Sequence, residues 1–167
     1  MTSAALSAPI SIDLQTMNER WPPLQLPRAE LSLSRKQGQI YVWDKIRQKH
    51  LLLTPEEWVR QHFVHYLLDL GYPQGQIALE AGLYVNRQLR RTDILVYREQ
   101  EPRLVVECKA PQVRITQETF DQASRYNLAL KVNIVVVTNG LSTFVAQRQN
   151  EGAGYTLLEG LPGYSDL

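Results

Sequence analysis

Three charged side chains interrupt two strongly apolar stretches of the chain. Asp93 directly precedes the run Ile-Leu-Val-Tyr, and Glu107 and Lys109 close the run Leu-Val-Val. Charges are rare in buried strands because removing an unpaired ion from water is costly. Side chains alternate along a strand, so Glu107 and Lys109 share one face, roughly 7 Å apart, while Cys108 points to the other. Adjacent strands lie about 4.8 Å apart, so Asp93 reaches Glu107 if the two runs pair.

Such a convergence predicts phosphodiester hydrolysis at a magnesium ion. Two neighbouring carboxylates repel each other unless a cation lies between them. Mg²⁺ prefers oxygen and commonly takes one or two carboxylates with water and a phosphate, and we expect Mn²⁺ to substitute for it. Asp93 and Glu107 are the predicted ligands, together with the backbone carbonyl of Cys108. Lys109 would orient or deprotonate the attacking water and offset charge on the phosphate. An ordinary salt bridge from Lys109 to either carboxylate explains the same spacing, and spacing alone leaves both interpretations open.

Two further acidic residues are candidate accessory ligands. Glu57 lies at the start of a helix that Thr54 and Pro55 begin, so it either approaches the metal or completes a local T-x-x-E capping box. Glu80 lies on a predicted strand and is either an accessory ligand or a surface residue.

Two basic clusters are candidate DNA contacts, because contacts to phosphates dominate nucleic-acid affinity. The alternative is a solvated turn for the first cluster and a solvated helix start for the second. The clusters are Arg87, Arg90 and Arg91 just before Asp93, and Lys45, Arg47 and Lys49 upstream of the helix.

The elements that must position these residues follow from hydrophobic periodicity and turn signals. Two short strands around a turn at Gln37-Gly38 come first, then the helix, three strands in an antiparallel meander, a second helix, a buried strand and a further strand. The third strand, second helix and fourth strand form a crossover, so those strands should pair in parallel. The class is therefore α/β (α+β), a mixed β-sheet flanked by helices. The ranges after the first hairpin are helix 54–70, strands 77–85, 92–97 and 103–110, helix 116–130, and strands 132–138 and 141–147.

The composition is that of one globular domain. A chain of 167 residues with 44% hydrophobic and 21% charged residues can bury one proper core. We expect residues 31–167 to form that domain and residues 1–30 to form a proline-rich arm, which Trp21, Leu24 and Leu26 could dock.

Charge and cysteine content narrow the function classes. The net charge of +1 means that any nucleic-acid surface must be a local patch. A single cysteine excludes an intrachain disulfide and a multi-cysteine metal site. We find no signal peptide and no apolar run near the ~20 residues that span a bilayer, so we expect a cytoplasmic protein without membrane contact.

The ordered blocks TDILVY, LVVECKAP and FDQASRYN resemble the core of the PD-(D/E)XK nuclease superfamily. With LTPEEWVRQHF and VVVTNG, they are similar to the N-terminal nuclease domain of type I restriction enzyme R subunits and to small stand-alone bacterial proteins of that type. The resemblance spans roughly residues 40 to 145. Thr92 replaces the superfamily's proline before the motif aspartate, a variation the superfamily tolerates.

The resemblance implies a restriction-endonuclease-like sheet with core order α-β-β-β-α-β, here followed by an extra C-terminal strand. It implies Mg²⁺ at Asp93 and Glu107, and it implies that Gln122 and Tyr126 form a Q-x-x-x-Y motif that positions substrate or Lys109. Four residues apart, Gln122 and Tyr126 share a helix face. The alternative is a polar pair on an exposed face, with Phe120, Ala123 and Leu130 making the core contacts.

Three functional hypotheses remain from the sequence. The first is a metal-dependent DNA endonuclease, a hydrolase, or the nuclease component of a restriction-modification or DNA-processing system. The second is a non-catalytic nucleic-acid-binding or interaction module that retains the fold. The third is a structural protein whose Asp, Glu and Lys form only an ionic network. DNA is the expected partner, a protein partner or homodimer is left open, and ATP is not expected because no G-x-x-x-x-G-K-[ST] phosphate loop is present.

Overall fold

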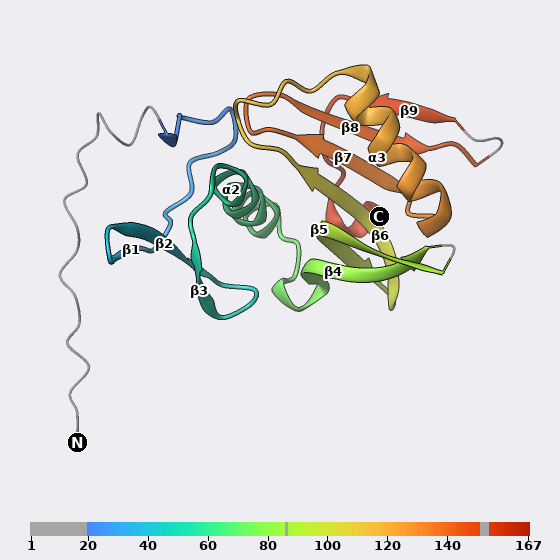
Figure 1. Ribbon diagram of the computed structural model, residues 1–167. Coiled ribbons are helices and arrows are strands. Elements are labelled where there is room, and N and C mark those ends of the chain that lie inside the picture. Colours follow the sequence, from blue (N-terminus) through green and yellow to red (C-terminus); the bar gives the residue numbers. More distant parts are fainter. Residues whose placement is uncertain (1–19, 86, 151–153) are drawn as a thin grey trace.

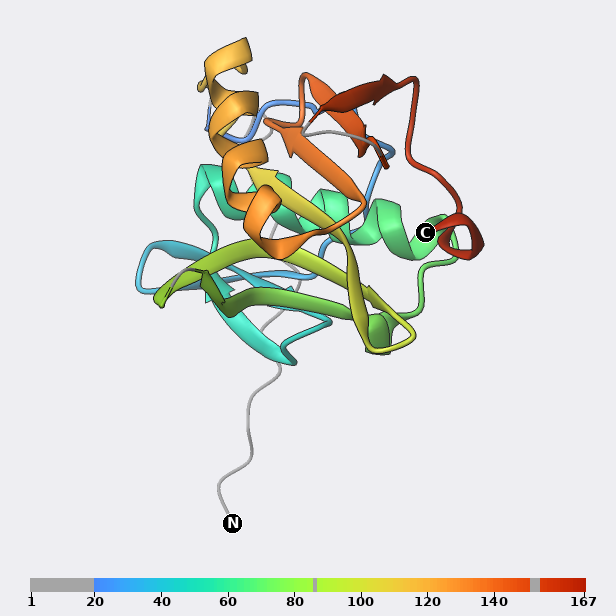
Figure 2. The ribbon, with the colours of Figure 1, turned by 90° about the vertical axis from the view of Figure 1, so that its right-hand side faces the viewer.

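The computed structural model describes residues 20–85, 87–150 and 154–167, and within them two long α-helices and two sheets (Figure 1). A three-stranded sheet has the order β1-β2-β3, and a six-stranded sheet has the order β4-β5-β6-β7-β8-β9. Helix α2 lies between the two sheets, and helix α3 covers the other face of the larger sheet (Figures 1 and 2). The predicted mixed sheet flanked by helices is confirmed.

The small sheet consists of β1 (Leu33–Lys36), β2 (Gln39–Asp44) and β3 (Lys49–Leu52). The predicted turn joins β1 and β2, with φ of 50° at Gln37 and 78° at Gly38. Positive φ at both central positions suits the twist of an antiparallel hairpin. Sequence analysis missed β3, because its four residues are too few to show a hydrophobic period.

Helix α2 (Pro55–Asp69) begins where predicted. The Thr54 hydroxyl accepts a hydrogen bond from the Glu57 amide at 3.1 Å, which satisfies one of the open donors of the first turn. On one side α2 contacts the small sheet through Trp58, which packs on the buried Trp21 of the arm. Phe63 faces the larger sheet, so the two apolar sides of α2 fix it between the layers.

The larger sheet is antiparallel except between β6 and β7, which pair in parallel. Helix α3 (Gln117–Leu130) makes the predicted crossover between these two strands. All five residues of β7 are buried, as expected for a strand covered on both faces. The strands are β4 (Ile77–Val85), β5 (Gln88–Arg98), β6 (Glu101–Cys108), β7 (Ile134–Thr138), β8 (Thr143–Arg148) and β9 (Tyr155–Leu158).

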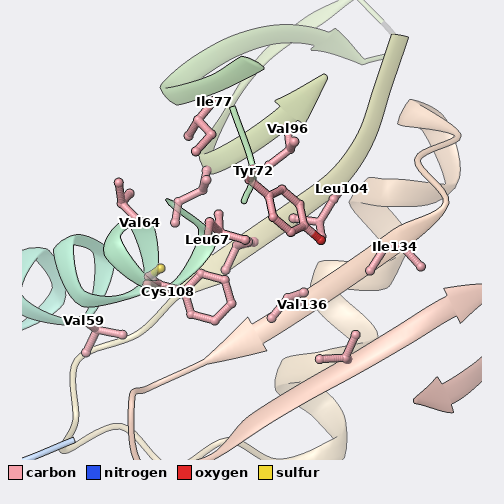
Figure 3. Close-up of a cluster of buried hydrophobic side chains, with 14 residues drawn as sticks. Val59, Val64, Leu67, Tyr72, Ile77, Val96, Leu104, Cys108, Ile134 and Val136 are labelled. Atoms are coloured by element: carbon pink, nitrogen blue, oxygen red, sulfur yellow. The ribbon is translucent and has the colours of Figure 1, made fainter. Parts of the chain in front are cut away.

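Alternating side chains divide the larger sheet into two faces. Val106 and Val136 belong to the apolar cluster under α2, which also contains the Cys108 side chain (Figure 3). Val105 and Val135 belong to the cluster under α3. This alternation fixes the direction of Glu107, which shares the α3 face with Val105.

Two sequence expectations need correction. The stretch from Asn86 to Arg91 was expected to be a turn, but β5 already begins at Gln88, so Arg90 and Arg91 lie on a strand. The strands of the β4–β5 hairpin continue beyond the residues that show an apolar pattern. The end of the hairpin projects into solvent, so its residues need no buried apolar face. Strand β9 was not expected either.

The arm docks within its described part, residues 20–30. Trp21 is 4% exposed, and the Trp58 indole donates to the carbonyl of Pro22 at 3.1 Å. Leu24 and Leu26 pack against the main core, as predicted, and the Gln25 amide donates to the carbonyl of Gly140 at 2.7 Å. Residues 1–19 of the predicted arm lie outside the described residues.

Candidate metal centre

Asp93, in the middle of β5, and Glu107, near the end of β6, lie on adjacent strands of the larger sheet. The β5–β6 ladder ends with Ile94 opposite Val106, so Asp93 and Glu107 occupy the next opposed positions in this register. The Asp93 carboxylate Oδ2 accepts a hydrogen bond from the backbone amide of Cys108 at 2.7 Å. The predicted meander therefore brings the two carboxylates together.

Lys109 completes the predicted triad by contacting Glu107. Its Nζ donates to Glu107 Oε1 at 2.7 Å, and about a third of each side chain is exposed. Burial and then the charge of Asp93 raise the pKa of Glu107 above its ordinary value. Burial alone would lower the pKa of Lys109, but the hydrogen bond to Glu107 and the nearby carboxylates raise it. The ammonium is thus held in its charged form beside the paired carboxylates.

Glu56 of α2 faces the same place, and sequence analysis did not select it. Burial and the charge of Asp93 raise the pKa of Glu56, and Glu107 adds to this effect. Three carboxylates, from α2, β5 and β6, therefore act on one another electrostatically. Periodicity gave no signal for Glu56, because Glu56 and Glu57 are adjacent at the start of a helix. Which of the two side chains faces Asp93 depends on how the helix packs against the sheet.

Arg60 is the second residue of the site that sequence analysis missed. Its side chain is 6% exposed, and its Nη2 donates to Asp93 Oδ1 at 2.8 Å. Nη1 of the same guanidinium contacts Glu57 Oε2 at 2.5 Å, and Nη2 lies 3.3 Å from Glu56 Oε1. Burial lowers the pKa of Arg60, but the charges of Glu57 and Asp93 outweigh burial and raise it. One buried cation thus orients Asp93 and links it to α2.

Glu57 is an anchor of the ionic network rather than part of a capping box. Its backbone amide donates to Thr54, but its carboxylate binds Arg60, Arg47 and the Gln61 amide group. The expectation of a T-x-x-E capping box is therefore only half right, because charged partners compete successfully for the carboxylate. A full capping box occurs instead in α3, between Thr116 and Thr119.

Arg47 is engaged by three carboxylates. It contacts Asp44 at 2.7 Å, Glu57 at 3.0 Å and Glu80 at 2.5 Å, and its side chain is 13% exposed. This placement favours a structural role for Arg47 over the predicted phosphate contact. Glu80 has a positive φ of 50° and reaches Arg47 rather than the Asp93 carboxylate, which favours a structural role for it as well.

The other predicted phosphate contacts are exposed. Arg87, with φ of 65°, lies at the β4–β5 turn, and Arg90 and Arg91 follow on β5 towards Asp93. Lys45 and Lys49 flank the β2–β3 turn. The placement of all five suits contact with a polyanion, and that contact stays a prediction.

Of the predicted Q-x-x-x-Y pair, Gln122 lies exposed on α3, and the side chain of Tyr126 is outside the described part of the structure. The core contacts of α3 come from Phe120, Ala123 and Leu130, as the alternative interpretation expected. The pair's functional role remains a prediction.

The donor set fits a hard divalent cation with few protein ligands. Among the described residues, no group of three or more acidic, histidine or cysteine side chains is arranged to hold a metal ion without other ligands. Mg²⁺ commonly needs only one or two carboxylates and completes its shell with water and substrate phosphate. Asp93 and Glu107 meet that requirement, and a cation between them would relieve the repulsion that helps to raise the pKa of Glu107. The carbonyl of Cys108 stays a predicted ligand.

Comparison with known protein families decides the relationship. Residues 55–162, more than half of the chain, match the type I restriction enzyme R protein N terminus. The chain belongs to this family. The matched region begins at the first residue of α2. It therefore includes the triad, Glu56 and Arg60, but not the small sheet. It confirms the resemblance drawn from the sequence blocks.

The other comparisons add no relative. No match was found among curated proteins, and none among solved structures. In the described ranges, neither helix has the length and apolar character that a membrane crossing requires.

Proposed function

We propose that this protein is a Mg²⁺-dependent deoxyribonuclease, acting as an endonuclease or as the nuclease component of a restriction or DNA-processing system. The observation that carries the proposal is the meeting of Asp93 and Glu107 from adjacent strands, with Lys109 hydrogen-bonded beside them. Membership in the restriction enzyme R N-terminal family supports it.

Each residue has a distinct role in the proposed reaction. Asp93 and Glu107 would hold the cation, and Glu56 would add negative charge beside them. When bound, Mg²⁺ would lower the pKa of a coordinated water and polarise the phosphoryl oxygen. Lys109 orients the attacking water with its ammonium and offsets the charge that grows on the phosphate. Arg60 keeps the Asp93 carboxylate in place through the bond to Oδ1.

DNA contacts would surround this centre. Arg90 and Arg91 extend along β5 from Asp93, so a backbone lying across the site would meet their exposed side chains. Gln122 would contact the strand from α3, with Tyr126 one helical turn further on.

One observation favours the structural alternative, in which the charged residues form only an ionic network. Arg60 already neutralises Asp93, so a purely ionic network linking α2 and β5 would explain their proximity without any metal. That alternative predicts that the protein binds no divalent cation.

Cleavage of single-stranded and duplex DNA with Mg²⁺ or Mn²⁺ tests the proposal. Asp93→Asn and Lys109→Met should each reduce the rate at least about 100-fold, the scale on which proton-transfer and charge-stabilising groups act. Matched controls are Glu118→Gln and Lys36→Met, since both residues are exposed and lie outside the site. Wild-type rates in both site variants, or no metal-dependent cleavage by the wild-type protein, would refute the proposed function.

A further inference from the structure

A cavity of about 290 Å³ opens beside Glu107, between α3 and the start of β5. Its floor includes Val105 and Val135 of the sheet, and its roof includes Ala123 and Leu130 of α3. This volume is near the lower end of ligand pockets, which start at roughly 300 Å³. Two opposed apolar walls at this size suit one flat ring system rather than a peptide or a large cofactor.

One residue of the cavity wall carries a buried polar atom that has no partner among the described residues. Asn127 lines it, is 1% exposed, and donates through Nδ2 to the carbonyl of Val132 at 2.9 Å. A carbonyl only accepts, so this bond fixes the nitrogen and oxygen of the amide. Oδ1 has no hydrogen-bond partner among the described residues. Buried side-chain oxygens without partners are rare, because each costs about 1–3 kcal/mol. The oxygen therefore calls for an N–H or O–H donor.

The rim of the cavity adds charge on two sides. Arg91 and Thr92 line it from β5, and Glu107 lines it from β6. Glu107 is also a proposed metal ligand, so a group in the cavity would lie within one nucleotide of the reacting phosphate. The exposed side chain of Arg91 is placed to contact that nucleotide's backbone.

We propose that this cavity binds one unstacked nucleobase of the substrate strand. The aliphatic walls enclose the ring, and a base amino group or ring N–H donates to Asn127 Oδ1. A base can enter only where it is unpaired, and freeing it from a duplex costs a few kcal/mol. The preferred substrate at the cleavage point is therefore single-stranded DNA. This inference names the substrate class of the proposed nuclease, so it rests on the proposed function.

Methyl NMR of the full chain tests occupancy without requiring cleavage. The protein, labelled with ¹³C at Ala, Leu and Val methyls, is titrated without divalent metal with the tetranucleotide d(CACA) and with a fully abasic strand of equal length. The base-bearing strand should shift the methyls of Ala123, Leu130 and Val135, and it should bind at least tenfold tighter than the abasic strand. The duplex of the same sequence, extended to a stable length, should bind at least tenfold more weakly.

A filled cavity provides the matched variant. Ala123→Met should lower the affinity for d(CACA) at least tenfold and leave the affinity for the abasic strand unchanged. Gln117→Leu is the control, because it adds an apolar side chain to the same helix at an exposed position outside the cavity. Near-ultraviolet circular dichroism shows whether Ala123→Met folds. If it does not, the affinities of the wild-type protein for the base-bearing and the abasic DNA strand still test the base site.

Equal affinity for base-bearing and abasic strands, or shifts confined to surface methyls, would overturn the base site. Metal-dependent cleavage accompanied by that result would leave the proposed nuclease intact. Base-dependent shifts without any cleavage would support the base site and refute the nuclease.

Discussion

At the scale of single residues, the site combines oppositely charged side chains that are partly buried. Asp93 receives a guanidinium from α2 and a backbone amide from β6, while Glu107 receives the ammonium of Lys109. Burial first, and then the charge of Asp93, raise the pKa of Glu107 despite the hydrogen bond from Lys109. A bound divalent ion would offset the contribution of Asp93.

Arg60→Met tests the importance of the buried cation. Removing one partner of a buried ionic network leaves uncompensated charge, so the free energy of unfolding should fall by about 3–5 kcal/mol. Urea unfolding without divalent metal measures this loss. The control Arg35→Met, at an exposed position on β1, should change stability by less than about 0.5 kcal/mol.

A second substitution shows whether the effect passes through Asp93. The double variant Arg60→Met with Asp93→Asn should recover part of the loss, because it removes a charge that Arg60 had neutralised. A loss below about 1 kcal/mol for Arg60→Met, or strict additivity in the double variant, would show that the pair does not stabilise the fold.

Sequence reasoning found the triad but not its supporting side chains, for a physical reason. Asp93, Glu107 and Lys109 are conspicuous because they interrupt apolar strands whose alternation fixes their direction. Arg60 and Glu56 lie on a helix that carries several charges, and nothing in a 3.6-residue period shows which of them turns inward. Their selection depends on how α2 is rotated between two sheets.

At the scale of elements, α2 joins the site to the C-terminal segment. Just beyond α2, Tyr72 is buried, its hydroxyl donates to the carbonyl of Pro162 at 2.7 Å, and its ring contacts that of Tyr164. Tyr164 in turn donates to the carbonyl of Tyr97 on β5 at 3.1 Å. The C-terminal segment therefore fastens the end of α2 to the sheet.

This contact predicts a loss of stability in alkali. Burial raises the pKa of Tyr72 from 10.0 to about 12. Between these values the folded protein retains a proton that the unfolded chain releases, so stability falls as pH rises from about 10 to about 12. The full effect is about 2–3 kcal/mol. Urea unfolding at pH values in this range measures it.

Tyr72→Phe is the control for the alkaline effect. This variant keeps the ring but cannot ionise, so its stability should fall less steeply with pH over the same range. Parallel profiles for the wild-type protein and Tyr72→Phe would contradict the role assigned to the buried hydroxyl.

Strong local signals made most elements predictable. Thr54 with Pro55, the Gln37-Gly38 turn and the apolar run of β7 each specify one local structure. The short strands β3 and β9 escaped notice because each has four residues, whose pairing is decided by neighbours distant in sequence. The same limit hid the cavity beside Glu107, which residues of β5, β6, α3 and β7 line together.

At the scale of the whole molecule, two sheets enclose α2, and the site lies where α2, β5 and β6 meet (Figure 1). The family match begins with α2, so the small sheet and the arm lie outside the matched residues. The small sheet nevertheless reaches the site, because Arg47 from the β2–β3 turn contacts Glu57. This contact helps to hold the helix that carries Glu56 and Arg60.

A divalent cation bound between Asp93 and Glu107 is the central requirement of the proposed nuclease. Calorimetric titration of the full chain with Mn²⁺ tests this point directly, with Glu107→Gln as the site variant and Glu118→Gln as the matched control. We predict saturable Mn²⁺ binding by the wild-type protein and the control, and at least about tenfold weaker binding by Glu107→Gln, because one of two carboxylate ligands is lost. Equal binding by all three proteins, or none by the wild type, would contradict the proposed metal site and leave the triad as an ionic network.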